Sequence, residues 1–401
     1  MINLEDYAQY ADGETIEELL LTAESIKGLK VLHVNSTREG GGVAEILSRL
    51  VPLMNALGIE THWEVFKGSE EFFRFTKKLH NMLHLPGFSR IESHEVATYL
   101  RTTYENLNSI KTEAYHVVFI HDPQPMGMVI NKQKHQKWVW RCHIDTSTPD
   151  PKAWDFIELF INAYDATVFH IPEFVYQKLQ VPAYIIPPSI DPLHPKNIEL
   201  DRDFILQTLE KFGIDPQRPI LLQVSRFDRL KDPIGVYQAY RMVKSKYACQ
   251  LILAGSYASD DPEGEEVYRE VLNATADDRD VFVLNLPPNS HLEINALQRA
   301  STVVLQKSIR EGFGLVVSEA MWKQKPVIGG NVGGIKRQII EGTTGFLVNT
   351  IEGTAYRARQ LLSDRELRER MGFYARNRVK HRFLIIRHLR DYLVLLKSLL
   401  R

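Results

Sequence analysis

Cysteine is nearly absent from this 401-residue chain, which contains only Cys142 and Cys249. Two cysteines cannot form the disulfide framework of a small secreted domain, and their wide separation gives no metal-binding spacing. Long apolar runs are absent too, because no stretch reaches the roughly 18 apolar residues that cross a membrane. The acidic start, MINLEDYAQYADGETIEELL, lacks the basic and then apolar pattern of a signal peptide. We therefore expect a cytoplasmic protein that has no membrane partner.

The chain also lacks an excess of either charge, since 49 basic residues face 50 acidic ones and the net charge is −1. Proteins that bind nucleic acid through bulk charge need a strongly basic face, so we expect no nucleic-acid partner. The hydrophobic content of 44% and the charged content of 25% are ordinary for a soluble globular protein. At roughly 150 residues per domain, the length predicts two domains.

Short apolar runs alternate with helical patterns along most of the chain, which predicts an α/β protein with parallel sheets wound by helices. The strand candidates of the first half are residues 31–35, 61–66, 116–122 and 138–145, all expected to be buried. Those of the second half are residues 219–225, 250–255, 280–286, 301–306 and 325–330. The sequence thus predicts two doubly wound, Rossmann-like halves that face a central ligand cleft.

A proline-rich segment, IPPSIDPLHP at residues 186–195, separates the two halves, because proline is disfavoured inside helices and strands. We place the N-terminal domain at residues 1–186 and the C-terminal domain at residues 187–382. The last segment, residues 383–401, carries one apolar stripe at helical spacing. It is expected to pack back on the first domain, and a helix lying on a membrane surface is the alternative.

Three consecutive glycines, Gly40 to Gly42, follow the first predicted strand and precede a helical pattern. Backbone amides at the start of a helix attract anions, and glycine lets a phosphate approach the backbone closely. The segment is not a dinucleotide-binding fingerprint, because Glu45 stands where the third glycine should be and no Walker-type lysine follows. A phosphate-binding loop and a plain tight turn both fit it.

Two basic residues, Arg226 and Lys231, lie in the segment SRFDRLKD that follows the first strand of the second half. A guanidinium offers a planar fork of donors and an ammonium offers a point charge, and together they suit a diphosphate. Basic residues in a loop are more often simply solvated, and that alternative stays open.

The segment REGFGLVVSEA at residues 310–320 places Glu311 before a Gly-Phe-Gly turn and Glu319 eight positions later. The helix that starts after the turn again offers amides to an anion. Buried carboxylates need hydrogen-bond donors, and sugar hydroxyls are such donors. The apolar neighbours of Glu319 disfavour the alternative that it is exposed. Two carboxylates flanking a bond are also typical of glycoside hydrolases, so a hydrolase stays an alternative.

Four polar residues, His121, Asp122, His143 and Asp145, end two predicted strands of the first half. Their sequence spacing matches no strong metal-binding pattern, so we expect no metal site. Hydrogen bonding to a polar ligand is the favoured interpretation, and a structural role is the alternative.

The segment EGFGLVVSE at residues 311–319, the pair Arg226 and Lys231, and the Gly40–Gly42 loop together resemble the retaining glycosyltransferases of the GT-B fold, family 4 type. Within that class, further segments resemble the trehalose glycosyl-transferring synthases. These segments are NSTREGGGVAEIL (35–47), HDPQP (121–125), WRCHIDTS (140–147), PPSIDPL (187–193) and VSRFD (224–228). The resemblance implies transfer of glucose from a nucleoside diphosphate glucose to free glucose, which gives α,α-trehalose.

The same resemblance implies a donor site. Arg226 and Lys231 would clamp the diphosphate, helped by the backbone of Gly41 and Gly42. Glu319 would accept hydrogen bonds from the ribose, and Glu311 would hold the 3-hydroxyl of the donor glucose. Further donor contacts are implied for Gly312, Phe313, Gly314 and Leu315 beside the turn and for Asn285 and Leu286 near the base.

For the reaction centre, the resemblance implies that His143 contacts the donor glucose near its 6-hydroxyl, and that Asp122 and Asp145 lie on the acceptor side. The implied catalytic set is Glu311, Arg226, Lys231 and His143. The diphosphate itself would take the acceptor proton on the face from which it leaves. No cofactor is obligatory, and whether Mg²⁺ accompanies the diphosphate stays open.

Several alternatives survive at the level of sequence. Lys77, Lys78 and Arg90 leave open a basic pocket for a sugar phosphate, and a glucan acceptor is a further possibility. A nucleotide-sugar-binding protein that has lost catalysis is the alternative from another class, whereas Glu45 disfavours a dinucleotide-dependent dehydrogenase. The choice between UDP-glucose and ADP-glucose, the reversibility of the reaction and a homodimeric state also stay open.

Overall fold

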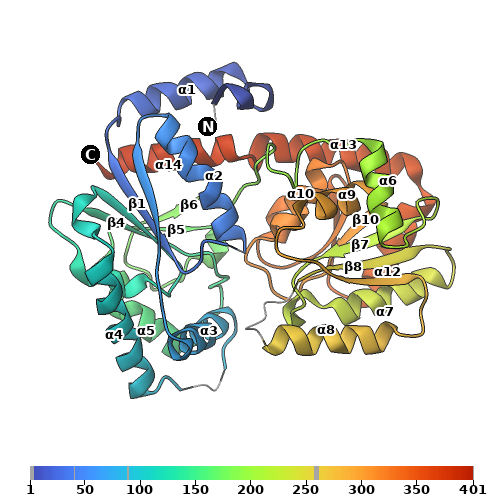
Figure 1. Cartoon of the computed structure of the whole chain (residues 1–401), viewed down its shortest axis with the longest axis horizontal. Coiled ribbons are helices and arrows are strands. Elements are labelled where there is room, and N and C mark those ends of the chain that lie inside the picture. The colour runs from blue at the N-terminus through green and yellow to red at the C-terminus, as the bar shows by residue number, and fades with distance from the viewer. Residues whose placement is uncertain (1–3, 40, 88–89, 257–261, 401) are drawn as a thin grey trace. The chain divides into compact units, whose positions relative to one another are not determined.

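The computed structural model describes residues 4–39, 41–87, 90–256 and 262–400. The chain forms two compact units, which Figure 1 shows. The first unit comprises Met1–Ser189 together with Ile385–Arg401, and the second comprises Ile190–Leu384. Both crossings between the units therefore lie within a few residues of the limits of 186 and 383 that we had placed from the sequence.

The first unit is built on a fully parallel six-stranded sheet in the order β2-β1-β3-β4-β5-β6. Its strands are β1 (Lys30–Asn35), β2 (Glu60–Val65), β3 (Val117–His121), β4 (Lys137–Arg141), β5 (Ala166–Phe169) and β6 (Ala183–Ile185). Its longer helices are α1 (Gly13–Glu24), α2 (Gly42–Ala56), α3 (Glu70–His84), α4 (Ser93–Ser109), α5 (Pro151–Ile161) and α14 (Ile385–Leu399). The expected strand 138–145 was too long, because the chain leaves the sheet after Arg141.

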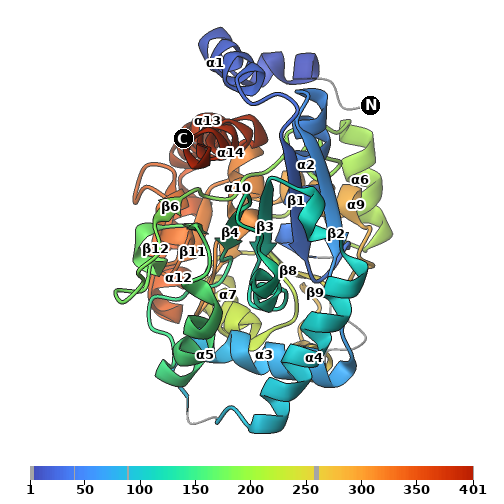
Figure 2. The same ribbon diagram turned by 90° about the vertical axis from the view of Figure 1, so that its left-hand side faces the viewer.

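Successive residues of these strands point to opposite faces, and each face packs against its own group of helices. Val118 and Ile120 belong to a large apolar core that also holds side chains of α3, α4 and α5. Phe119 points the other way and contacts the ring of Tyr392 in α14, with 5.2 Å between ring centroids. Figure 2 shows α3, α4 and α5 on one side of the strands and α1 and α14 on the other.

The C-terminal helix α14 packs on α1 and α2 and buries most of its apolar side chains. The buried Arg141 and the half-buried Arg387 hold the carbonyl groups of the proline-rich segment beside it. Arg141 donates to the oxygen of Ile186 at 2.6 Å, and Arg387 donates to the oxygens of Pro187 and Pro188 at 2.8 and 3.0 Å. The residues from Ile186 to Pro188 belong to no strand, so the guanidinium groups satisfy carbonyls that a strand partner would otherwise bind.

The second unit repeats the architecture with a parallel sheet in the order β12-β11-β10-β7-β8-β9. Its strands are β7 (Ile220–Val224), β8 (Gln250–Gly255), β9 (Val281–Asn285), β10 (Val303–Gln306), β11 (Val327–Gly330) and β12 (Gly345–Val348). Its helices are α6 (Arg202–Lys211), α7 (Pro233–Lys244), α8 (Pro262–Thr275), α9 (His291–Ala300), α10 (Leu315–Trp322), α11 (Ile335–Gln338), α12 (Ile351–Ser363) and α13 (Arg365–Arg382). None of the helices formed by the described residues is long and apolar enough to cross a membrane.

The sequence analysis did not predict three of the strands, and it predicted the wrong burial pattern for a fourth. β5, β6 and β12 have only three or four residues each, although β10 and β11, with four residues each, were predicted. β2 was expected to be buried, but it is an edge strand in which exposed and buried residues alternate along most of its length.

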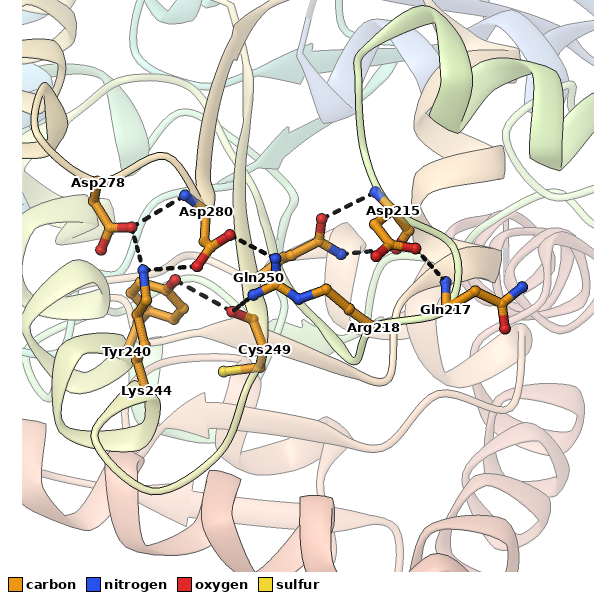
Figure 3. A network of polar contacts seen from close by, with 9 residues as sticks. All are labelled: Asp215, Gln217, Arg218, Tyr240, Lys244, Cys249, Gln250, Asp278 and Asp280. Atoms are coloured by element: carbon orange, nitrogen blue, oxygen red, sulfur yellow. Dashed lines mark hydrogen bonds and ion pairs between the residues drawn. The ribbon is translucent and has the colours of Figure 1, made fainter.

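A network of polar contacts ties together the amino ends of β7, β8 and β9, as Figure 3 shows. Arg218, which precedes β7, donates to Asp280, which precedes β9, at 2.6 Å. Lys244 at the end of α7 lies 2.8 Å from Asp280 and also pairs with Asp278. Parallel sheets of this kind bind ligands at the carboxyl ends of their strands, so this network at the opposite edge serves stability.

Replacing Asp280 with asparagine is expected to lower the free energy of unfolding by about 1 kcal/mol at neutral pH. Hydrogen bonds from Arg218 and Lys244 lower the pKa of Asp280, so its contribution is complete above the unfolded value of about 3.9 and is lost as the pH falls below it. Urea unfolding of wild type and Asp280→Asn from pH 7 to pH 3 should therefore give curves that converge toward acid pH. The matched control is Glu24→Gln, because Glu24 and its partner Lys27 form an exposed pair. A deficit for Asp280→Asn that equals the control, or that grows toward acid pH, would contradict the assignment.

Candidate functional site

Each sheet has one point where the direction of winding reverses. In the second unit the chain runs from β7 outward through β8 and β9 and then returns to the other side of β7 with β10. In the first unit the reversal lies between β1 and β3. Loops diverge at such switch points and leave a crevice beyond the carboxyl ends of the strands, where open α/β sheets bind their ligands. The predicted site residues follow these strands.

In the second unit, the structure brings Lys231 and Glu311 into direct contact. Lys231 follows β7, Glu311 follows β10, and their Nζ and Oε2 atoms lie 2.7 Å apart. The hydroxyl of Ser308 also donates to Oε2, at 3.1 Å, and the side-chain amide of Gln306 lies 3.5 Å from it. Among the described residues, the hydrogen bonds of Glu311 all fall on Oε2. Its other oxygen, Oε1, therefore keeps its capacity to accept from a ligand hydroxyl.

The turn after Glu311 starts helix α10 and is fixed by close backbone packing. Gly314 has a φ of 80°, a left-handed conformation that glycine adopts without strain. A Cβ atom on Gly333 would lie 1.7 Å from the carbonyl oxygen of Glu311, so only glycine fits there. The side-chain amide of Gln338 donates to the carbonyls of Phe313 and Gly314 at 2.6 and 3.2 Å. Gly312, Gly314 and Leu315 are half-buried and Phe313 is buried, so the turn is a rigid part of the unit.

Glu319 lies in the second turn of α10 and is 1% exposed. Its Oε2 accepts from the side-chain amide of Gln298 at 3.1 Å, and its Oε1 lies 3.8 Å from Nζ of Lys196. Burial alone would raise the pKa of Glu319, but the charges of Lys196 and Lys323 outweigh burial and lower it. Glu319 is therefore a buried carboxylate that stays ionised among partners of its own unit.

Among the described residues, Arg226, Asn285 and Leu286 form no hydrogen bond or ion pair with Lys231 or Glu311. The side chain of Arg226 is 58% exposed, and its ion-pair partner among the described residues is Asp228, at 3.9 Å. Asn285 ends β9 and is exposed, whereas Leu286 is buried and donates its backbone N–H to the carbonyl of Gly255 at 2.6 Å. The structure thus assembles half of the predicted cation pair and leaves Arg226 extended into solvent.

In the first unit, predicted residues lie on both sides of the switch point. Gly41, with a φ of 81°, caps helix α2, which begins at Gly42, while Gly40 lies outside the described residues. Asp122 follows β3 with a φ of 63°, which is uncommon for a residue other than glycine. Its Oδ1 accepts from the backbone N–H of His143 at 2.7 Å. Burial raises the pKa of Asp122 to about 7, although that hydrogen bond lowers it.

His143 and Asp145 follow β4, and their polar atoms already have protein partners. The ring of His143 lies between two other histidines, with Nε2 2.9 Å from Nδ1 of His121 and Nδ1 3.1 Å from Nε2 of His170. Asp145 is buried, and its Oδ1 accepts from the backbone N–H and the hydroxyl of Ser147. The carboxylate of Asp145 therefore stabilises its own loop.

Sequence reasoning missed several residues that hold these groups. Gln306, Ser308 and Lys196 contact the two glutamates, and His33 and His170 extend the histidine cluster. His170 directly follows the missed strand β5, so a correct assignment of that strand would have revealed it as another polar residue at a carboxyl end. His33 sits inside an apolar run and carries no such signal. Among the described residues, no group of three or more His, Cys, Asp or Glu side chains is arranged to hold a metal ion.

Comparison with known proteins identifies both units. A family model described as "Trehalose synthase, N-terminal domain" matches residues 33–176, and one described as "Glycosyl transferases group 1" matches residues 205–378. The trehalose synthase of Thermococcus litoralis is 46% identical over 398 residues, which cover 98% of this chain and 97% of that protein. The trehalose synthase of Rubrobacter xylanophilus is 43% identical over 411 residues, which cover 99% of this chain and 97% of that protein.

Among solved structures, sucrose-phosphate synthase from Thermosynechococcus elongatus matches with a TM-score of 0.73 at 18% identity, covering 93% of this chain and 99% of that one. At this identity the likeness concerns the fold alone, and it confirms the predicted GT-B fold with two Rossmann-like sheets. The high identity to trehalose synthases over nearly the full length confirms the resemblance drawn from the motifs. The chain belongs to the trehalose synthase family of GT-B glycosyltransferases.

Proposed function

We propose that this protein is a retaining glucosyltransferase that moves glucose from UDP-glucose or ADP-glucose to free glucose and thereby forms α,α-trehalose. The observation that carries the proposal is the contact of Lys231 with Glu311 at the switch point of the second sheet, beside the glycine turn of α10. The names of the full-length relatives support the product, and the glycosyltransferase family model supports a transfer reaction.

The donor is assigned to the second unit. Lys231 and the exposed Arg226 supply positive charge for the diphosphate, and the start of α10 supplies backbone amides. Oε1 of Glu311 accepts a hydrogen bond from the glucose, while Lys231 and Ser308 keep the carboxylate in place through Oε2. Glu319 accepts hydrogen bonds from the ribose hydroxyls.

In the proposed reaction, the bond between the anomeric carbon and the phosphate oxygen breaks, and the acceptor oxygen bonds to that carbon on the same face. The acceptor proton passes to the departing phosphate oxygen, so no carboxylate base is needed. Negative charge grows on the diphosphate, where in this proposal Lys231, Arg226 and the amides of the turn stabilise it. Preorganised donors of this kind lower a barrier by about 3–4 kcal/mol each.

Free glucose is the preferred acceptor in this proposal because one of the basic residues suited to a phosphorylated acceptor already has partners. The ammonium of Lys78 lies 2.8 Å from Glu95 and also donates to the carbonyl of Arg90. A lysine whose charge is already balanced by a carboxylate attracts a phosphate only weakly. The groups at the switch point of the first sheet, Asp122 above all, are assigned to the sugar acceptor.

Replacing Glu311 with alanine is expected to lower kcat about 100-fold or more, because its carboxylate orients the glucose that reacts. The affinity for free UDP or ADP, measured by calorimetry, should change only a few-fold, since the nucleotide lacks that sugar. Glu352→Ala is the control, because Glu352 is an exposed glutamate in the first turn of α12. Equal losses in turnover and in nucleotide affinity would rule out the sugar-holding role.

Replacing Arg226 and Lys231 together with alanine is expected to raise the donor KM and to slow transfer, with a combined loss in kcat/KM of about 1000-fold. Arg229→Ala is the matched control, because Arg229 lies in the same loop and pairs with Glu266 and Glu270 on the surface. Kinetics of the double variant that match those of the control would overturn the diphosphate clamp.

The substrate assignment is tested with labelled UDP-glucose and ADP-glucose against free glucose, glucose 6-phosphate and a glucan. We expect a disaccharide only with free glucose, and anomeric proton couplings in its NMR spectrum should identify α,α-trehalose. Transfer only to glucose 6-phosphate, or only to the glucan, would show that free glucose is not the acceptor. Nucleotide-sugar binding with no transfer to any acceptor would instead identify a binding protein without catalysis.

A further inference from the structure

Four histidines form a hydrogen-bonded chain across the first sheet. Nδ1 of His33 lies 3.0 Å from Nε2 of His121, whose Nδ1 lies 2.9 Å from Nε2 of His143. Nδ1 of His143 in turn lies 3.1 Å from Nε2 of His170. The residues belong to, or follow, β1, β3, β4 and β5, which are neighbours in that order in the sheet. Only His143 is half-buried, and the other three are buried.

His33, His121 and His143 favour the neutral form. Burial lowers the pKa of His33 to about 3 and holds the pKa values of His121 and His143 well below the ordinary range. The buried guanidinium of Arg141 lowers the pKa of His121 and His143 further. A neutral imidazole has one donor nitrogen and one acceptor nitrogen, so consecutive N–H···N bonds must all point the same way.

The end of the chain at His33 selects the direction. Nε2 of His33 is buried and has no hydrogen-bond partner among the described residues. A proton on Nε2 would be a buried unsatisfied donor, whereas a proton on Nδ1 is donated to His121. The ring cannot easily turn away, because it stacks on Phe119 with 4.8 Å between centroids and 9° between planes. The cheaper arrangement places the proton on Nδ1 of His33, His121 and His143.

We propose that His33, His121 and His170 are positioning residues that hold His143 as a neutral ring with its proton on Nδ1 and with both nitrogens occupied. His143 then presents a fixed, uncharged ring and takes no part in proton transfer. This inference deepens the proposed function, since it rests on the assignment of the acceptor sugar to the carboxyl ends of the first sheet. It leaves the departing phosphate as the base.

The state of His143 is measured by long-range nitrogen–proton NMR on protein labelled with ¹⁵N in its histidine rings, at about pH 8, where ordinary histidines are neutral. Loss of a signal in single substitutions assigns each ring. His116 is an internal reference for the opposite form, because its Nδ1 accepts the backbone N–H of Lys30 at 3.0 Å and its proton must sit on Nε2. We expect His143 to give the Nδ1–H pattern. An Nε2–H pattern or an imidazolium for His143 in the wild type would overturn the proposal without any variant.

Two substitutions at His33 test the positioning role. His33→Leu removes the donor that starts the chain, and His33→Asn keeps a side-chain N–H near the place of Nδ1. We expect His143 to show mixed protonation in His33→Leu, with kcat about tenfold lower and the donor KM little changed, and both effects to be largely reversed in His33→Asn. An unchanged His143 spectrum in a folded His33→Leu protein contradicts the role. If no acceptor is glucosylated by the wild type, the proposed function fails while the NMR result still decides the state of the chain.

Discussion

The ion pair between Lys231 and Glu311 is the interaction on which the organisation of the second unit depends. Each charge lies mostly out of water, and removing one partner of such a pair typically costs about 3–5 kcal/mol because the other is left uncompensated. The pair joins the loops on both sides of the switch point between β7 and β10. In the part of the chain that the structure describes, the hydrogen bonds of Glu311 fall on Oε2, so its second oxygen keeps its capacity to accept a hydrogen bond.

Polar groups play different roles at the amino ends and at the carboxyl ends of the strands in this sheet. At the amino ends, Arg218, Lys244 and Asp280 satisfy one another and close the edge. At the carboxyl ends, the ion pair of Lys231 with Glu311 lies beside the glycine turn that starts α10, and Arg226 is exposed. In the first unit, the polar groups at the carboxyl ends of the strands are mostly buried. They can be buried because the histidines favour the neutral form and the guanidinium of Arg141 donates to carbonyls, which avoids the cost of isolated charges out of water.

Much of the fold was predictable because alternating apolar runs and helical patterns reflect burial on both faces of a parallel sheet. The strands with five or more buried residues, such as β1, β3, β7 and β8, were found. Among the shorter strands the result was mixed, because so few residues show no clear period: β10 and β11 were found, whereas β5, β6 and β12 were missed. The glycine turn and Glu311 were predictable because their chemistry is local, whereas Lys196 and Gln298 reach Glu319 from distant segments.

The sequence by itself determined the two wound sheets, the motif order that marks the family, and the residue types that suit a diphosphate and a sugar. These follow from local periodicity and from short motifs. Only the tertiary structure decided that Lys231, rather than Arg226, contacts Glu311, and that His143 has both ring nitrogens bound to other histidines. Such contacts join residues that are tens of positions apart, and they form only where neighbouring parallel strands bring their carboxyl ends to one edge.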